Sequence, residues 1–132
     1  MSEKLLVRII LPSKTFLEIE ASLVNIPGGD GIFGVLPGHA KLTSTIDVGV
    51  ISLFINDVEK IYYVHGGVAQ VTGDEVNIVT EYAASIADSN KTTITNEITD
   101  LKEELASEEE NSIESDILLA KIEKHQSLIK FL

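Results

Sequence analysis

The sequence predicts an α+β protein with a small N-terminal β-sandwich followed by a C-terminal antiparallel two-helix hairpin. Up to about Thr80, short runs rich in β-branched residues alternate with turn residues, which is typical of strands. After Tyr82, apolar residues recur every three or four positions, which indicates helices. No proline follows Pro37, so nothing in the sequence breaks these helices. We therefore expect a β-sandwich domain over residues 1–84 and a helical hairpin over residues 85–132.

The expected strands are short and closely spaced, and they cover residues 5–11, 16–21, 22–26, 48–55, 59–64, 68–72 and 75–80. Turn residues separate them: Pro27-Gly28-Gly29 ends the third strand, and Gly66-Gly67 separates the fifth from the sixth. Many short strands with frequent turn signals predict a sandwich or a barrel. Because aromatic residues make up only 5% of the chain, the core must be aliphatic.

The two expected helices cover residues 90–108 and 113–131, joined by a short polar connection. Each helix carries one narrow apolar stripe. The stripes are Ile94, Ile98, Leu101 and Leu105 in the first helix, and Leu118, Ile122, His125, Ile129 and Leu132 in the second. Two narrow stripes bury little surface, so the pair is marginally stable by itself. We interpret the separable helical arm on its rigid β base as a moving part.

Composition and charge exclude several functional classes. The chain has 132 residues and a net charge of −11, so it repels nucleic-acid phosphates and anionic lipids. It has no cysteine, which removes disulfides, thiolate zinc sites and cysteine nucleophiles. No run approaches the roughly 20 apolar residues that span a bilayer. We expect the N-terminal residues to form a first strand and not a signal peptide.

Few residues in the sequence indicate a catalytic or metal-binding site. His39, His65 and His125 have no metal-binding spacing; we expect His65 to cap a turn and His125 to lie half-buried between the helices. The acidic run around Glu108-Glu109-Glu110 lacks the pattern of a calcium loop and reads as a solvated hairpin tip. The glycine-rich residues 27–31 open no helix, so they form no phosphate loop. No catalytic constellation is recognisable, and we expect neither catalysis, nor metal, nor cofactor.

Segment 31–42 carries the most specific pattern, with Gly31, Gly34, Pro37, Gly38 and His39 in the order Gly-Ile-Phe-Gly-Val-Leu-Pro-Gly-His-Ala-Lys-Leu. A second pattern, tyrosine followed by Gly-Gly and valine, covers residues 63–71. Together with residues 76–83, these stretches closely resemble the epsilon subunit of F-type ATP synthases. The order of parts agrees as well, and the resemblance covers essentially the whole chain.

The resemblance implies a non-catalytic rotor subunit on the central stalk of the proton-translocating enzyme. The sandwich would bind the gamma subunit and touch the polar loops of the membrane c-ring. The hairpin would fold against the sandwich, or extend toward the beta subunits of the catalytic head and inhibit ATP hydrolysis. The location implied is the cytoplasmic face of a bacterial plasma membrane, with no segment inserted in the lipid.

Segment 31–42 is then a stiff interface loop. Pro37 restricts one backbone dihedral, while Gly34 and Gly38 permit sharp bends. Asp30 matches an acidic residue at the c-ring end of the family, and His39 matches the motif histidine near gamma. The interface residues that this implies are Asp30, Gly34, Pro37, Gly38, His39 and Leu42. The alternative for His39 is a hydrogen bond within its own turn.

The helical part departs from the family in two ways. Some bacterial epsilon subunits bind ATP through an Ile/Leu-Asp-x-x-Arg-Ala element, but residues 89–94 here lack the arginine, and Lys91 offers only a displaced charge. From Asp88 onward there are eleven acidic and five basic residues, a net charge of −6. Like charges oppose docking on an acidic segment of a beta subunit. We therefore expect weak inhibition, confined to Lys121, Lys124 and Lys130.

Two other classes stay open. A free-standing adaptor or chaperone would grip its clients with the helical arm, which requires exposed apolar residues at a tip that here is rich in glutamate. A small carbohydrate- or cofactor-binding sandwich enzyme would require a cluster of polar groups in a pocket. Copurification separates the three classes, since a rotor subunit comes out with gamma, an adaptor with many clients and an enzyme alone.

Overall fold

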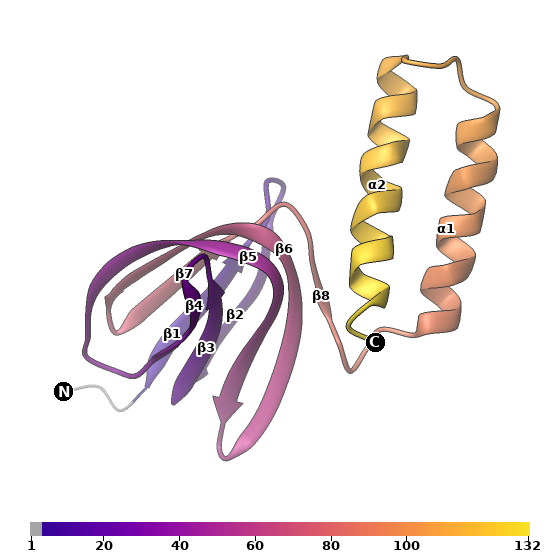
Figure 1. The fold of residues 1–132 in the computed structure, drawn as a ribbon. Coiled ribbons are helices and arrows are strands. Elements are labelled where there is room, and N and C mark those ends of the chain that lie inside the picture. The colour runs from indigo at the N-terminus through magenta and orange to yellow at the C-terminus, as the bar shows by residue number, and fades with distance from the viewer. Residues whose placement is uncertain (1–3) are drawn as a thin grey trace. The chain divides into compact units, whose positions relative to one another are not determined.

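A computed structural model describes residues 4–132 and confirms the expected fold class. The chain forms two compact units, Met1–Ala87 and Asp88–Leu132. The first consists of β-strands and the second of two helices joined by a short turn (Figure 1). Each unit is described separately below.

The strands of the first unit alternate with tight turns, as the sequence predicts, but residues 31–35 and 39–47 form strands where none was predicted. They are β1 (Leu5–Ile10), β2 (Thr15–Ala21), β3 (Leu23–Gly28), β4 (Gly31–Val35), β5 (His39–Ile55), β6 (Val58–Gly73), β7 (Glu75–Val79) and β8 (Ala83–Ser85). They are connected in the order β2-β1-β7-β6-β5-β3-β4, with β8 paired to β6. The two end strands of this order, β2 and β4, are the edges of the sheet.

The long strands β5 and β6 curve and serve both layers of the sandwich (Figure 1). Residues 68–71 of β6 pair with β7, whereas residues 62–64 pair with β8. Between these two stretches lie Gly66 (φ 73°) and Gly67 (φ 128°), in backbone conformations that favour glycine. The expectation that Gly66-Gly67 separates two strands is therefore wrong, because the pair bends one continuous strand from one layer into the other.

The core between the layers is aliphatic, as expected. Alternate residues of β1, namely Leu5, Val7 and Ile9, are fully buried, and Val76 and Ile78 follow the same alternation in β7. This period of two places one face of each strand in the core. Tyr62 and Tyr63 are the buried tyrosines among the described residues.

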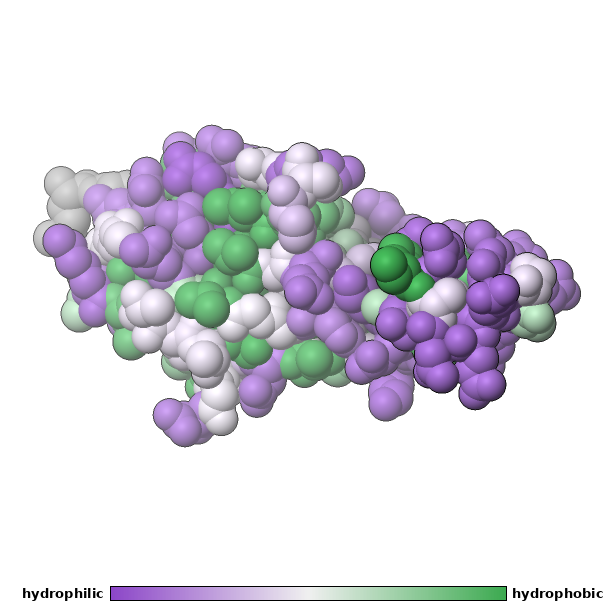
Figure 2. All heavy atoms as spheres, turned by 90° about the horizontal axis from the view of Figure 1, so that it is seen from above, coloured by the Kyte–Doolittle hydropathy of each residue, from purple (hydrophilic) through white to green (hydrophobic). Residues whose placement is uncertain are grey.

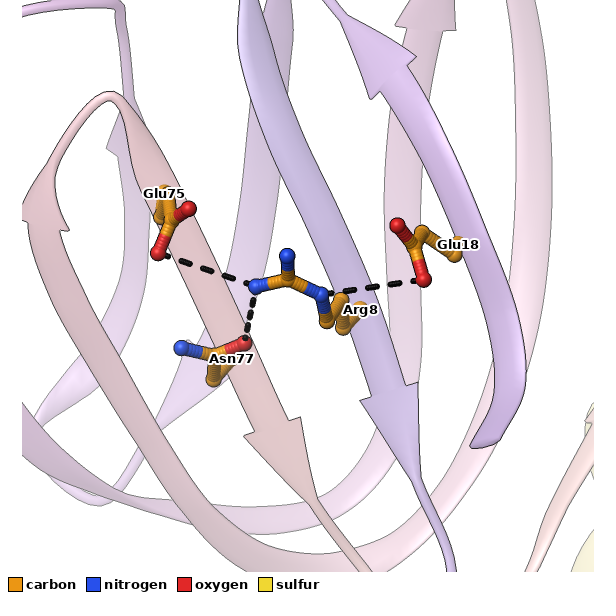
Figure 3. A network of polar contacts seen from close by, with 4 residues as sticks. All are labelled: Arg8, Glu18, Glu75 and Asn77. Carbon is orange, nitrogen blue, oxygen red and sulfur yellow. Dashed lines mark hydrogen bonds and ion pairs between the residues drawn. The ribbon is translucent and has the colours of Figure 1, made fainter. Parts of the chain in front are cut away.

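The outer face of strands β2, β1 and β7 carries a polar network centred on Arg8 (Figure 3). The Arg8 guanidinium lies 3.7 Å from the Glu18 carboxylate, 3.6 Å from that of Glu75 and 3.3 Å from the Asn77 side-chain oxygen. Arg8 pairs with Glu18 of β2 on one side of β1 and with Asn77 of β7 on the other side. Because the carboxylates are half exposed, each ion pair contributes at most about 1 kcal/mol. The network is therefore a surface feature of the sheet.

The second unit consists of α1 (Lys91–Ala106) and α2 (Ile113–Ile129), within two residues of the expected bounds. The Asn90 side-chain oxygen accepts from Thr93 N at 3.1 Å, and the Ser112 hydroxyl accepts from Ser115 N at 3.0 Å, so both helices have capped N-termini. Neither helix, in the part of the chain that is described, is long and apolar enough to cross a membrane.

The expected stripes are buried in part. Ile94, Ile98, Leu118 and Ile122 are between 6 and 9% exposed. His125 is half-buried as expected, with Nε2 3.2 Å from the Glu97 carboxylate of α1 and Nδ1 2.7 Å from the carbonyl oxygen of Lys121. The contact between His125 and Glu97 links α2 to α1.

A second apolar surface on α2 was not expected. Ile113 is 75% exposed and Ile117 is 51% exposed, and both lie in the half of α2 that follows the acidic turn. The argument that this tip lacks exposed apolar side chains is therefore wrong. The acidic residues of the tip are exposed as expected, and apolar side chains lie beside them.

Candidate subunit interface

Asp30 lies at the tip of a tight hairpin. Strands β3 and β4 pair up to Gly28 and Gly31, which leaves Gly29 and Asp30 as the two turn residues. Residues 27–29 end the strand as predicted, but β3 continues through Pro27 and Gly28, two residues further than expected, and the turn begins at Gly29. The pairing of β3 with β5 is irregular between Asn25 and Gly28, which accommodates a proline without a backbone N–H. The Asp30 side chain is exposed at this tip.

Pro37 and Gly38 form the centre of a type II turn. His39 N donates to the Leu36 carbonyl oxygen at 3.0 Å, and Gly38 has a φ of 81°, which is the conformation that the third position of this turn requires. Gly38 N also lies 3.2 Å from both the Gly73 carbonyl and the Asp74 carboxylate. The turn is thus tied to the turn between β6 and β7, and this stiffens it.

His39 begins β5 opposite Gly73 and is half-buried. Its Nδ1 lies 2.7 Å from the carbonyl oxygen of the next residue, Ala40. The ring is therefore oriented by its own local backbone, as the alternative described above requires. A ring held in this way is also presented at a fixed position.

Gly34 does not make a bend. It lies within β4 opposite Asn25, and a Cβ at this position would lie 3.1 Å from the Asn25 side-chain oxygen. The expectation of a bend is therefore wrong, because Gly34 lies within a regular strand pair, where a side chain would need Asn25 to shift by a few tenths of an ångström. Segment 31–42 is consequently an edge strand, a turn and the start of a long strand, and the loop proper is limited to the turn.

The apolar side chains of segment 31–42 face mostly outward. Ile32 is 79% exposed, Leu36 is 59% exposed and Leu42 is 38% exposed, while Val35 is fully buried and anchors the strand. Sequence reasoning selected Leu42 and missed Ile32 and Leu36. Apolar residues occur on both faces of this edge strand, but the other layer of the sandwich covers only one face. That pattern could have predicted the exposure of Ile32 and Leu36.

A second exposed apolar surface lies where β6 meets β7. Val68 and Val79 are cross-strand partners that are 42 and 50% exposed, and Val48, opposite His65, is 45% exposed. A shallow groove of about 350 Å³ adjoins them and is lined by Pro12, His65, Gly67, Val68, Val79, Thr80 and Glu81. Figure 2 shows a face of the β unit on which hydrophobic side chains gather between hydrophilic ones.

His65 beside this groove does not cap a turn as predicted. Its Nδ1 lies 2.7 Å from the hydroxyl of Tyr63, whose side chain is fully buried, and its ring is 6.2 Å from the Tyr63 ring. Tyr63 in turn packs edge-on against Tyr82 at 5.9 Å. The tyrosine therefore holds the imidazole at the edge of the groove.

The three hairpin lysines lie in the second half of α2 and directly after it. Lys121 is exposed, Lys124 is half-buried, and Lys130 follows the helix as its C-cap. Lys121 and Lys124 are three residues apart, so they lie on neighbouring positions of the helix surface. Over residues 4–132 there is no group of three or more His, Cys, Asp or Glu side chains that could hold a metal ion.

Comparison with known proteins identifies the family. Residues 4–86 match the family described as ATP synthase, Delta/Epsilon chain, beta-sandwich domain. The ATP synthase epsilon chain of Rickettsia felis is 37% identical over 109 residues, which is 80% of this chain and 97% of that protein. The epsilon chain of Rickettsia bellii is 37% identical over 108 residues, covering 80% of this chain and all of that protein.

Solved structures have the same fold. A chain in the Euglena gracilis mitochondrial ATP synthase (OSCP/F1/c-ring) matches 98% of this chain with a TM-score of 0.66 at 16% identity, covering 79% of its own length. A chain of the Tetrahymena thermophila mitochondrial central stalk/c-ring matches 98% of this chain with a TM-score of 0.56 at 11% identity, covering 96% of its own length. With the β unit matching the family's sandwich domain and the relatives matching most of the chain, this protein belongs to the ATP synthase epsilon chain family.

Proposed function

We propose that this chain is a non-catalytic central-stalk subunit that couples the catalytic head to the c-ring. The observation that carries the proposal is the 37% identity to epsilon chains over 80% of the sequence. The β unit would bind gamma and touch the polar c-ring loops. The chain would be peripheral at the cytoplasmic face of a bacterial plasma membrane and would bind no nucleotide, since the arginine of the nucleotide element is absent.

Segment 31–42 is the part of the β unit that we assign to docking. The Gly38 N–H of its turn donates hydrogen bonds to the β6–β7 turn. These bonds make the docking segment rigid. Ile32, Leu36 and Leu42 supply exposed apolar area, and Asp30 supplies a charge at the tip of the adjoining hairpin. An apolar patch with a polar rim is the composition of a subunit interface.

Replacing Asp30 and His39 together by alanine is expected to weaken binding to a purified gamma subunit about tenfold, because two polar contacts of about 0.7 kcal/mol each are lost. The melting temperature should stay within about 2 °C, since Asp30 is exposed at a turn and His39 contacts only a local carbonyl oxygen. Isothermal titration calorimetry measures the affinity, and thermal melts measure the stability.

A matched control replaces two exposed glutamates, Glu20 and Glu59, by alanine. This double variant should bind gamma as the original chain does. Unchanged affinity of the Asp30/His39 variant would remove these residues from the interface, and loss of its fold would assign His39 a structural role.

The hairpin should inhibit ATP hydrolysis only weakly. Because its net charge is −6, deleting residues 88–132 is expected to raise hydrolysis by the assembled complex less than about twofold. Any inhibition that exists should disappear when Lys121, Lys124 and Lys130 are replaced by glutamine. A rise of tenfold or more on deletion, measured with a coupled ATPase assay, would contradict weak inhibition.

A further inference from the structure

We propose that the tip of the helical hairpin binds a cationic amphipathic helix of another protein chain. The binding surface is a groove between the end of α1 and the start of α2, with a volume of about 160 Å³. We call it the tip groove; its lining residues are Glu104, Glu108, Glu114, Ile117, Leu118 and Lys121. The proposal does not depend on the central-stalk role.

The floor of the tip groove is apolar. Leu118 is 6% exposed and forms the base, while Ile117 is 51% exposed beside it. Ile113, 75% exposed, lies one helical turn before Ile117 and extends the apolar surface toward the interhelical turn. A helix that packs its apolar side chains over Ile113 and Ile117 removes both from water, which is the main driving force for such docking.

The rim of the tip groove is acidic. Between Lys102 and Lys121 the sequence has seven carboxylates and no basic residue. Three of the seven, Glu104, Glu108 and Glu114, line the groove, and all three are exposed. Figure 2 shows hydrophobic atoms surrounded by hydrophilic ones on the helical unit.

This charge selects the chemistry of the partner. Lysine or arginine side chains flanking an apolar face would meet the carboxylates and relieve their mutual repulsion. An anionic membrane surface or a nucleic acid would be repelled by the same carboxylates. Lys121 closes the far end of the groove, so the partner's positive charges are expected near the interhelical turn. A cationic amphipathic helix is therefore the occupant that fits both the floor and the rim.

The test uses the full-length chain and a synthetic 18-residue helix of leucine and lysine with the two residue types on opposite faces. Fluorescence anisotropy should show saturable binding that weakens at least about tenfold when Glu104, Glu108 and Glu114 are all replaced by glutamine. Ile117→Ser should weaken binding about tenfold as well, because it removes apolar area from the floor.

Matched controls separate this groove from the overall acidity of the chain. Removing three exposed carboxylates from the β unit, by Glu20→Gln, Asp47→Asn and Glu59→Gln, should change the affinity less than about twofold. Val58→Ser removes an equally exposed apolar residue, 56% exposed, from the β unit and should have no effect. Amide chemical shifts should change at Ile113, Ile117 and Leu118.

Three results would overturn the proposal. One is equal weakening by the two carboxylate triples, which would make the attraction non-specific. Another is equally tight binding of a leucine–glutamate helix with the same pattern. The third is binding to anionic phosphatidylserine vesicles through the hairpin tip. Because gamma binding is measured separately with the Asp30/His39 variant, failure here leaves the proposed central-stalk function intact.

Discussion

Replacing Gly67 by alanine is expected to lower the free energy of unfolding of the β unit by about 4 kcal/mol or to prevent folding. Gly67 has a φ of 128°, where a side chain costs about 1–3 kcal/mol. A Cβ there would also collide with the carbonyl oxygen of Val79 and lie 3.2 Å from the Thr80 Cα. Relieving this overlap separates β6 from β7 and costs about 1–3 kcal/mol more. A thermal melt followed by circular dichroism should show a drop of roughly 20 °C.

Gly31→Ala is the matched control, because the chain offers a second glycine with nearly the same backbone conformation. Gly31 has a φ of 125°, but no atom lies within 4 Å of a Cβ built on it. Its substitution should cost only the conformational strain of about 1–3 kcal/mol. If the two variants melt at the same temperature, the close approach of β6 and β7 at Gly67 is not what requires glycine there.

Replacing Ile122 by aspartate is expected to unfold the hairpin. Ile122 is 6% exposed, and the hairpin has only a few such residues to hold its helices together. An uncompensated polar group in such a place costs about 2–7 kcal/mol, which exceeds what a short helical pair supplies. The helical circular dichroism signal should largely disappear, while amide resonances of β1 and β7 should keep their positions.

Ile117→Asp makes the same chemical change on the same helix at a side chain that is 51% exposed. It should retain the helical signal, with a loss of a few tenths of a kcal/mol from repulsion with neighbouring carboxylates. A helical unit that survives Ile122→Asp as well as it survives Ile117→Asp would show that the Ile94, Ile98, Leu118 and Ile122 contacts do not stabilise the hairpin.

Much of the candidate interface could be predicted from local sequence. The turn at Pro37-Gly38 follows from residue chemistry, because proline restricts one dihedral and glycine accepts a positive φ in the next position. The exposure of Asp30 follows in the same way from the glycines around it. The place of Gly34 within a strand did not follow, since it depends on pairing with Asn25, nine positions earlier and on the neighbouring strand.

His65 and the exposed apolar residues of α2 are further cases in which local sequence does not predict the environment of a side chain. His65 was assigned to a turn because two glycines follow it, but its position depends on the buried Tyr63 hydroxyl and on a strand that bends without ending. Ile113 and Ile117 lie outside the predicted apolar stripe of the second helix, and the sequence predicts no role for them. Only the packing of α1 against one side of α2 leaves them in solvent.

The sequence by itself determined the class of the fold, the order of its parts, the positions of both helices and the family. The first three depend on residue periods and turn residues that act over a few positions along the chain, whereas the family follows from the resemblance of residues 31–42, 63–71 and 76–83 to known sequences. Tertiary structure alone decided that β6 bends through Gly66-Gly67, that Gly34 pairs with Asn25 and that Ile113 and Ile117 are exposed. These features depend on which strands and helices become neighbours. The neighbours are determined by the burial of apolar side chains that are distant from one another in the sequence.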